Sequence, residues 1–145
     1  MYYFAYCSSM NFHQMRRLCG WHFTMLGMAV LPDFEFGLDL RGYANCRPKK
    51  DAKVYGILYN IDEHCLTALD EYEGAPEVFN RTEVAIQDKD GTERKAWVYL
   101  EKPQEFGGTQ VNETHFKMIV AGAMAGHLPK EWINFLQSFL KNTNA

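Results

Sequence analysis

The chain has 145 residues, of which 47% are hydrophobic and 14% aromatic, and its formal net charge is −3. This composition excludes a disordered chain, and the slightly acidic balance excludes the strongly basic surface of a dedicated nucleic-acid binder. No apolar run reaches the roughly 20 residues that span a bilayer, so we expect no membrane partner. The length and the absence of repeats or linkers predict one domain over residues 1–145.

The cysteines and the start of the chain predict a cytoplasmic protein. No basic segment followed by an apolar core and a small-residue cleavage site is found there, so nothing indicates export. The cysteines are scattered without a C-x-x-C pair, and we expect reduced thiols at Cys7, Cys19, Cys46 and Cys65. Cys19 and His22 have a spacing found in zinc sites, but a second pair is absent, and we therefore expect no metal there.

The sequence begins with a pattern that changes abruptly from strand to helix. Residues 2–7 predict a buried, aromatic-rich strand, and residues 10–18 predict a helix with Ser9 as N-cap and Gly20 just beyond its end. The small polar residues between them fit a plain turn. They equally fit a loop that offers backbone N–H groups and hydroxyls to a ligand, and the pattern alone leaves both open.

Three strands are predicted next, separated by two turns. Residues 22–30 and the alternating segment 34–40 are strand candidates on either side of a turn at residues 31–33. The proline and charges of residues 47–51 predict a second, solvated turn. Residues 53–61 are almost continuously apolar, as expected of a central strand.

The next stretch carries strong local signals for a helix and a hairpin. Asp62 is a good N-cap for a helix that ends at Gly74. The turn sequence Asp-Lys-Asp-Gly then predicts a hairpin that pairs residues 79–87 with residues 92–100.

Two helices are predicted toward the C-terminus, one over residues 112–126 with Asn112 as N-cap and one from Pro129 to residue 141. The element order does not alternate strand and helix as doubly wound folds do. It predicts an α+β fold with a mixed, strongly curved sheet and helices packed on it. Neither a G-x-G-x-x-G motif nor a P-loop supports nucleotide binding.

The helix predicted over residues 63–73 turns one carboxylate toward the protein interior. At about 100° per residue, Glu73 falls on the edge of the apolar face, whereas Glu71 lies nearly opposite. Burial and the negative end of the helix dipole both favour the neutral acid, which would raise the pKa of Glu73 toward the range useful for proton transfer. The alternative is a frayed helix end with Glu73 in solvent. The apolar face itself is formed by Cys65, Leu66, Leu69 and Tyr72.

Two stretches together make the chain similar to the gamma-glutamylcyclotransferase-like family over nearly its whole length. The first strand of that family ends in a Tyr-Gly-Ser-Asn loop, and a later helix ends in Leu-Asp-x-x-Glu-Gly. Here the corresponding segments are YCSSM at residues 6–10 and LDEYEG at residues 69–74. The segments VYGILY at residues 54–59 and GAMAGHLP at residues 122–129 add two weaker matches in the family's order.

This resemblance implies a mixed, β-barrel-like sheet flanked by helices and an intramolecular aminolysis. The α-amino group of a small γ-glutamyl amine or γ-glutamyl amino acid attacks its own γ-carbonyl, giving 5-oxoproline and a free amine. Glu73 would move the protons as general acid and base, without a cofactor. The oligomeric state is left open. The resemblance further implies that the glutamyl head is held by Tyr99 and by the loop residues Tyr6, Cys7, Ser8, Ser9 and Met10.

Two loop residues depart from the family pattern, since Cys7 replaces the glycine and Ser9 the asparagine. A glycine permits a positive φ or a close backbone approach, and a cysteine permits the first only at a cost of roughly 1 kcal/mol. One alternative is therefore a catalytically silent protein that keeps the pocket to bind a small ligand or a partner. Another is a Cys7 nucleophile activated by His13 or His115.

Overall fold

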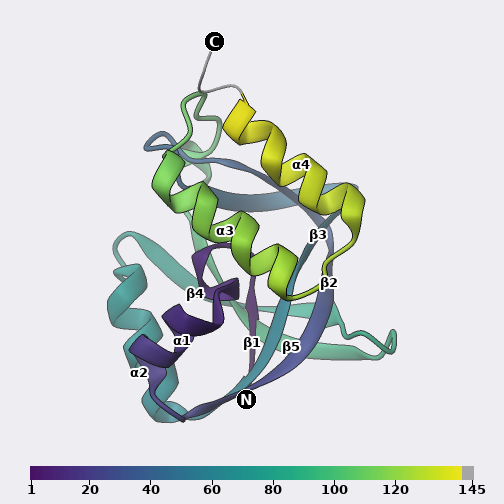
Figure 1. Cartoon of the computed structure of the whole chain (residues 1–145). Helices are drawn as coiled ribbons and strands as arrows, with labels where there is room; N and C mark the ends of the chain where they lie inside the picture. Colours follow the sequence, from purple (N-terminus) through teal and green to yellow (C-terminus); the bar gives the residue numbers. More distant parts are fainter. Residues whose placement is uncertain (142–145) are drawn as a thin grey trace.

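The strands of the chain close into a barrel with helices on its outside (Figure 1). The computed structural model describes residues 1–141, and the last four residues of the predicted domain, 142–145, lie outside the described residues. The predicted α+β class with a mixed, strongly curved sheet is confirmed. In barrel order the strands are β1 (Tyr2–Ala5), β3 (Ala44–Ile61), β2 (Phe23–Leu38), β4 (Phe79–Gln87) and β5 (Glu93–Glu101). The α-helices are α1 (Phe12–Cys19), α2 (Glu63–Glu73), α3 (Glu113–Ala125) and α4 (Lys130–Lys141).

Pairing in both directions closes this barrel. The short strand β1 is antiparallel to β3, with Tyr3 opposite Tyr59, and parallel to β5, with Tyr3 opposite Trp97. On the other side β2 meets β4 where Val30 lies opposite Gln87. The hairpin of β4 and β5 forms as its turn chemistry predicts. The short strand β1 thus completes the barrel between β3 and β5.

The turns predicted at residues 31–33 and 47–51 are wrong, because both segments lie inside the long strands β2 and β3. Asp33 has a φ of 61°, and the register shifts there so that Asp33 lies opposite residues 49–52. The residues that favour turns therefore produce a bulge in a continuing pair of strands. The chain reverses later, at residues 39–43, where it brings a different set of side chains to the end of the barrel.

Local capping signals set most helix ends. Asp62 and Asn112 accept hydrogen bonds from backbone N–H groups in the first turns of α2 and α3, as expected of N-caps. Gly74 ends α2 in the left-handed conformation. The predicted Ser9 cap is wrong: residues Ser8–Met10 form a short 3-10 turn, named η1, and Asn11 caps α1 instead.

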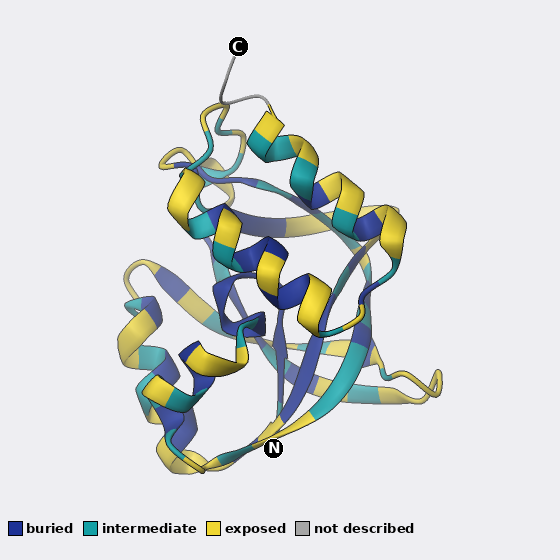
Figure 2. Ribbon diagram, viewed as in Figure 1, coloured by how far each residue is buried: buried dark blue, intermediate teal, exposed yellow. Residues whose placement is uncertain are grey.

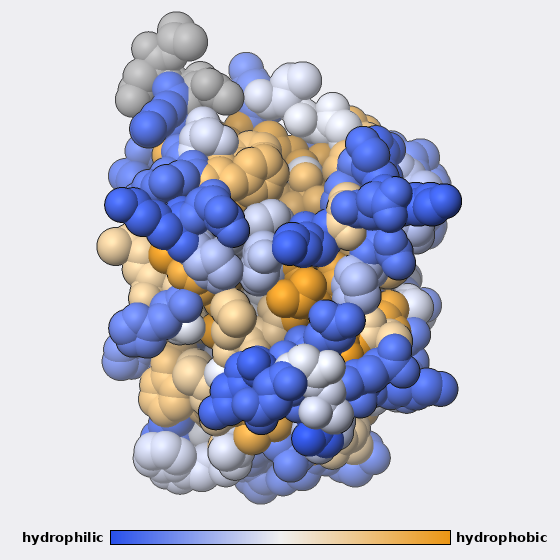
Figure 3. All heavy atoms as spheres, turned by 90° about the vertical axis from the view of Figure 1, so that its right-hand side faces the viewer, coloured by the Kyte–Doolittle hydropathy of each residue, from blue (hydrophilic) through white to orange (hydrophobic). Residues whose placement is uncertain are grey.

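Apolar side chains fill the barrel and the spaces beneath the helices. In Figure 2 the buried residues, dark blue, lie mainly on the parts of the ribbon that face the inside of the molecule. Helices α3 and α4 cover one side of the barrel, and α1 lies beside α2 below them (Figure 1). On the face drawn in Figure 3, apolar patches are divided by hydrophilic side chains. Among the described helices, none combines the length and the apolar character that crossing a membrane requires.

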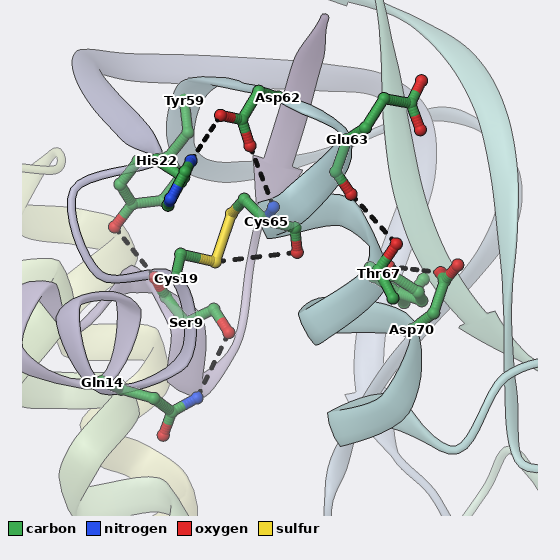
Figure 4. Close-up of a disulfide and its surroundings, with 11 residues drawn as sticks. Ser9, Gln14, Cys19, His22, Tyr59, Asp62, Glu63, Cys65, Thr67 and Asp70 are labelled. Atoms are coloured by element: carbon green, nitrogen blue, oxygen red, sulfur yellow. Dashed lines mark hydrogen bonds and ion pairs between the residues drawn. A yellow bond between two sulfur atoms is a disulfide. The ribbon is translucent and has the colours of Figure 1, made fainter.

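Cys19 and Cys65 form a disulfide, so the expectation of reduced thiols is wrong for this pair. The bond joins the end of α1 to the first turn of α2, with the two Cα atoms 4.7 Å apart (Figure 4). The sulfur of Cys19 is therefore not free to bind zinc together with His22. Cys7 and Cys46 are free and buried. Because the cytoplasmic location was inferred partly from reduced thiols, it stays a prediction.

Gly122 lets α3 lie directly on η1. A Cβ atom at this position would come within 2.9 Å of Met10 Cβ and of the backbone N of Asn11. We expect Gly122→Val to lower the free energy of unfolding by about 1–3 kcal/mol through overpacking, measured by urea unfolding. The control is Ala121→Val at the exposed neighbouring position, for which we expect a loss below about 1 kcal/mol. Equal losses in the two variants would contradict a tight contact at Gly122.

Candidate active site

A cavity of about 300 Å³ lies where the end of α2 faces the segment that follows β1. This volume is at the small end of the range for ligand pockets, and it suits a small polar molecule. The lining brings together the loop after β1, the β2–β3 reversal, the end of α2, the start of β4 and the first turn of α3. The lining residues are Cys7, Ser8, Arg41, Tyr43, Tyr72, Glu73, Gly74, Val78, Phe79 and His115.

Glu73 is the buried acid of this cavity. Its side chain points inward from the last turn of α2, and the residue is only 9% exposed, so the solvent-facing alternative is not what the structure shows. Burial raises its pKa from 4.5 to about 7, and the charge of Arg41 opposes this rise. Within residues 1–141, Glu73 Oε1 has no hydrogen-bond partner. A carboxyl group in this state can accept or donate a proton near neutral pH.

The buried face of α2 differs at one position from the apolar face that helical periodicity predicts. Leu66 and Leu69 are buried, but Tyr72 is 48% exposed and lies at the edge of the cavity rather than in the core. Its hydroxyl lies 3.4 Å from Ser8 Oγ. The last turn of the helix therefore presents a phenol and a carboxyl group to the same hollow.

The loop after β1 contributes two of its five predicted residues to the cavity surface. Cys7 and Ser8 line it, whereas Tyr6, Ser9 and Met10 are buried behind it. The Tyr6 hydroxyl donates a hydrogen bond to the carbonyl of Tyr99 (2.7 Å).

Further hydrogen bonds fix the buried part of this loop. The Tyr59 hydroxyl donates to the carbonyl of Ser9 (2.8 Å), and Gln14 Nε2 donates to both Ser8 Oγ (2.9 Å) and Ser9 Oγ (3.2 Å). Figure 4 shows the links of Tyr59 and Gln14 to Ser9. The loop is thus held rigidly from the side opposite the cavity.

The Cys7 side chain lies beside backbone N–H groups of the loop. The N–H groups of Ser8 and Ser9 lower the pKa of the Cys7 thiol, but burial outweighs them. The φ of Cys7 is −125°, so the cost of a left-handed conformation does not arise, and the side chain matters through the space it fills. Burial and the nearby Glu73 carboxyl group raise the pKa of the Cys7 thiol well above its usual range. This environment favours the thiol and not the nucleophilic thiolate.

His115 does not act as the base that a Cys7 nucleophile would need. Burial lowers its pKa to about 4. Its Nε2 accepts a hydrogen bond from the backbone N–H of Ala44 (3.3 Å), which fixes the neutral ring. Its ring lies against that of Tyr43, with centroids 4.6 Å apart. His115 therefore forms a neutral wall of the cavity.

Tyr99 lies behind the cavity and not on its surface. It is 3% exposed, and its hydroxyl donates a hydrogen bond to Asp70 Oδ1 (2.7 Å). The same Asp70 oxygen forms an ion pair with Arg81 Nε (2.7 Å). Burial raises the pKa of Tyr99, with Asp70 as the next cause and Glu73 as a smaller one. The structure thus places Tyr99 within electrostatic range of Glu73, in the wall that supports α2.

Sequence reasoning missed Arg41 and the acid pair that holds it. Arg41 Nη2 lies 3.1 Å from Asp39 Oδ2 and 3.1 Å from Glu101 Oε1. Burial and the neighbouring Asp39 raise the pKa of Glu101 to about 8, whereas hydrogen bonds from Glu101 and from the backbone keep the pKa of Asp39 low despite its burial. The proton of the pair therefore resides on Glu101. No local pattern marks these residues, because they meet only when the barrel closes.

Comparison with known proteins agrees with this architecture. Residues 53–136 match the family described as AIG2-like. The chain belongs to the AIG2-like family. This AIG2-like chain is also similar to "Gamma-glutamylaminecyclotransferase A" of Danio rerio, with 35% identity over 54 residues. That match spans 36% of the chain and about a third (34%) of the length of the relative.

Solved structures share the fold of this AIG2-like chain. A structure named "Gamma-glutamyl cyclotransferase" has a TM-score of 0.85 at 22% identity and covers 94% of this chain and 86% of its own. An AIG2-like protein from Mus musculus has a TM-score of 0.59 at 20% identity, covering 78% of this chain and 91% of its own. The predicted resemblance to the gamma-glutamylcyclotransferase-like family is thereby confirmed. At identities of 20–22% these structures show a shared fold and nothing further.

Proposed function

We propose that the protein is a gamma-glutamyl cyclotransferase that converts a small γ-glutamyl amine or γ-glutamyl amino acid to 5-oxoproline and the free amine. The observation that carries this proposal is Glu73, a buried acid without a hydrogen-bond partner among residues 1–141, with a pKa raised to about 7, at the wall of a small cavity. The family and the names of the relatives support the reaction class.

The chemistry requires one group that moves protons and a cavity that holds a folded substrate. The α-amino nitrogen of the substrate forms a bond to its own γ-carbon, and the bond from that carbon to the leaving nitrogen then breaks. The Glu73 carboxylate takes one proton from the attacking nitrogen and delivers one to the leaving nitrogen, so it ends in its starting state. Because both reacting groups belong to one molecule, the enzyme gains mainly by restricting the substrate to the reactive conformer.

The other predicted site residues take supporting parts in this proposal. Cys7 and Ser8 face the substrate, and the Ser8 hydroxyl lies between Gln14 Nε2 and the Tyr72 hydroxyl. Tyr6 and Ser9 hold the loop in place through their hydrogen bonds, and Met10 is buried beneath it. Tyr99 supports the wall behind Glu73. These roles follow from position: two residues of the set line the cavity and four lie behind it.

The direct test is to incubate the purified protein with a panel of γ-glutamyl amides and to measure 5-oxoproline. The panel includes γ-glutamyl amino acids, γ-glutamyl alkylamines and an α-glutamyl dipeptide, which cannot cyclise in the same way. Release of 5-oxoproline from at least one γ-glutamyl compound and none from the α-linked control is expected. A panel that yields no 5-oxoproline contradicts the cyclotransferase proposal.

Cys7 is the observation that favours the second candidate, a catalytically silent binding protein with the same pocket. Its side chain lines the cavity beside the Ser8 and Ser9 amides, where a glycine would leave room for a substrate oxygen. We expect Cys7→Gly to raise kcat by about 10-fold or more, since one oxyanion donor contributes about 100- to 1,000-fold in known cases. Steady-state assays of 5-oxoproline release measure this change.

The control is Cys46→Ala, which removes the other buried free thiol outside this cavity. An unchanged rate in Cys7→Gly would show that the sulfur does not obstruct the amides. A wild-type protein without turnover together with an active Cys7→Gly variant would support the silent binding protein.

A further inference from the structure

Arg41 is held in one orientation at the cavity wall. It lies within the β2–β3 reversal, and its guanidinium carbon lies 4.8 Å from the centre of the Tyr43 ring. The wholly buried Asp39 accepts hydrogen bonds from the backbone N–H groups of Arg41 (2.8 Å) and Tyr43 (2.9 Å) as well as from the guanidinium. Glu101 accepts a further bond from the same nitrogen, Nη2. A long side chain that is usually mobile is therefore ordered in advance of binding.

The same bonds leave part of the guanidinium available. Asp39 and Glu101 both bind Nη2, and within residues 1–141 the Nε and Nη1 groups of Arg41 have no hydrogen-bond partner. The side chain is 50% exposed and lines the cavity that contains Glu73. A fixed, planar guanidinium with free N–H groups is the usual receptor for a carboxylate.

Charges on the two sides of Arg41 decide where an anion can bind. A neighbouring hollow also includes Arg41, but two charged acids, Glu77 and Glu105, line it beside Lys102 and the protonated Glu101. In the cavity on the Glu73 side an anion meets less repulsion, because His115 is neutral there and Glu73 can hold its proton near neutral pH. Among the described residues that line it, Arg41 is the one with a permanent positive charge.

The loop amides, which would be the competing anion site, lie beside the Cys7 side chain, which lines the cavity there. We propose that Arg41 is the carboxylate receptor of this site and that the substrates are γ-glutamyl compounds bound through a carboxylate at Arg41. This inference rests on the proposed function. The carboxylate comes either from the α-carbon of the glutamyl head or from an amino acid that forms the leaving group, and these two sources share the same recognition chemistry.

Binding measurements test the proposal independently of turnover. The Glu73→Gln variant, which should bind without converting its ligand, is titrated by calorimetry with γ-glutamylalanine, with γ-glutamylethylamide and with glutarate. Arg41→Gln added to this variant is expected to weaken the binding of γ-glutamylalanine by about 10- to 100-fold, the loss typical of one charge-assisted pair. Arg41→Lys should recover part of this affinity, because lysine restores the positive charge but not the two parallel N–H donors of the guanidinium.

Arg94→Gln is the matched control. Like Arg41, Arg94 forms an ion pair, here with Asp88, and lies over an aromatic ring, that of Tyr2. It lines a different cavity. The substitution should leave all three affinities unchanged. A loss confined to γ-glutamylalanine assigns the leaving-group carboxylate, and an equal loss for γ-glutamylethylamide assigns the glutamyl head.

The outcomes also separate this proposal from the proposed function. The γ-glutamyl compounds could fail to bind while glutarate binds, with the binding of glutarate lost in Arg41→Gln. This result would support Arg41 as the carboxylate receptor and would show that the assignment of γ-glutamyl substrates is wrong. Affinities in a folded Arg41→Gln variant that equal those of its parent overturn the assignment of Arg41. The absence of any binding by the three ligands overturns it as well.

Discussion

Glu73→Gln should reduce the rate of 5-oxoproline release by about 100-fold or more, the range that a single general acid-base residue contributes. Glutamine keeps nearly the same size and shape, but it cannot take a proton from the attacking nitrogen or return one to the leaving nitrogen. The fold should be unaffected, because in the described part of the chain Glu73 Oε1 has no hydrogen-bond partner to lose. Rates are measured with the best substrate of the panel, and the far-UV circular dichroism spectrum verifies the fold.

Glu71→Gln is the matched control for this experiment. Glu71 lies on the same helix two residues earlier and is exposed, whereas Glu73 is 9% exposed and lines the cavity. Neutralising Glu71 should leave the rate within about twofold, since a solvated charge outside the site makes little difference. Wild-type turnover in Glu73→Gln would remove this carboxyl group from the mechanism.

The features that could be predicted from the sequence are those encoded within a few residues. The Asp62 and Asn112 caps and the Asp-Lys-Asp-Gly hairpin turn each depend on neighbours in the chain, and all three formed as predicted. The inward direction of Glu73 also follows from local helical periodicity, because the residues it aligns with lie within two turns of it. Periodicity did not predict the exposure of Tyr72, since a residue at the edge of the apolar face of a helix can face either the core or a cavity.

Features that depend on closure of the barrel could not be predicted. The partners of the Cys19–Cys65 disulfide are 46 residues apart and lie on different helices, so only the packing of α1 beside α2 brings them together. Arg41 and Glu101 are 60 residues apart and meet because the β2–β3 reversal lies against the end of β5. A proline and charges at residues 47–51 predict a turn from local preference, and the pairing of two long strands overrides that preference.

The same variant, Glu73→Gln, should become more stable than the wild type as the pH rises. The native pKa of Glu73 is raised from 4.5 to about 7, chiefly by burial. Below about pH 4.5 both the native and the unfolded state carry the proton, so ionisation contributes no difference. Between pH 4.5 and about 7 only the native state retains the proton, and wild-type stability falls as the pH rises. Above about pH 7 the loss is complete, at up to about 3 kcal/mol.

Glutamine does not titrate, so the stability difference between Glu73→Gln and the wild type should grow by up to about 3 kcal/mol from pH 4 to pH 8. Urea unfolding of both proteins with the Cys19–Cys65 disulfide intact measures it. The raised pKa of Glu101 affects the two proteins equally and cancels in the difference. A difference that stays constant with pH would mean that the Glu73 carboxylate is as well solvated in the native state as in the unfolded chain. Loss of turnover together with this gain in stability would show that the cavity keeps an acid at the expense of the fold.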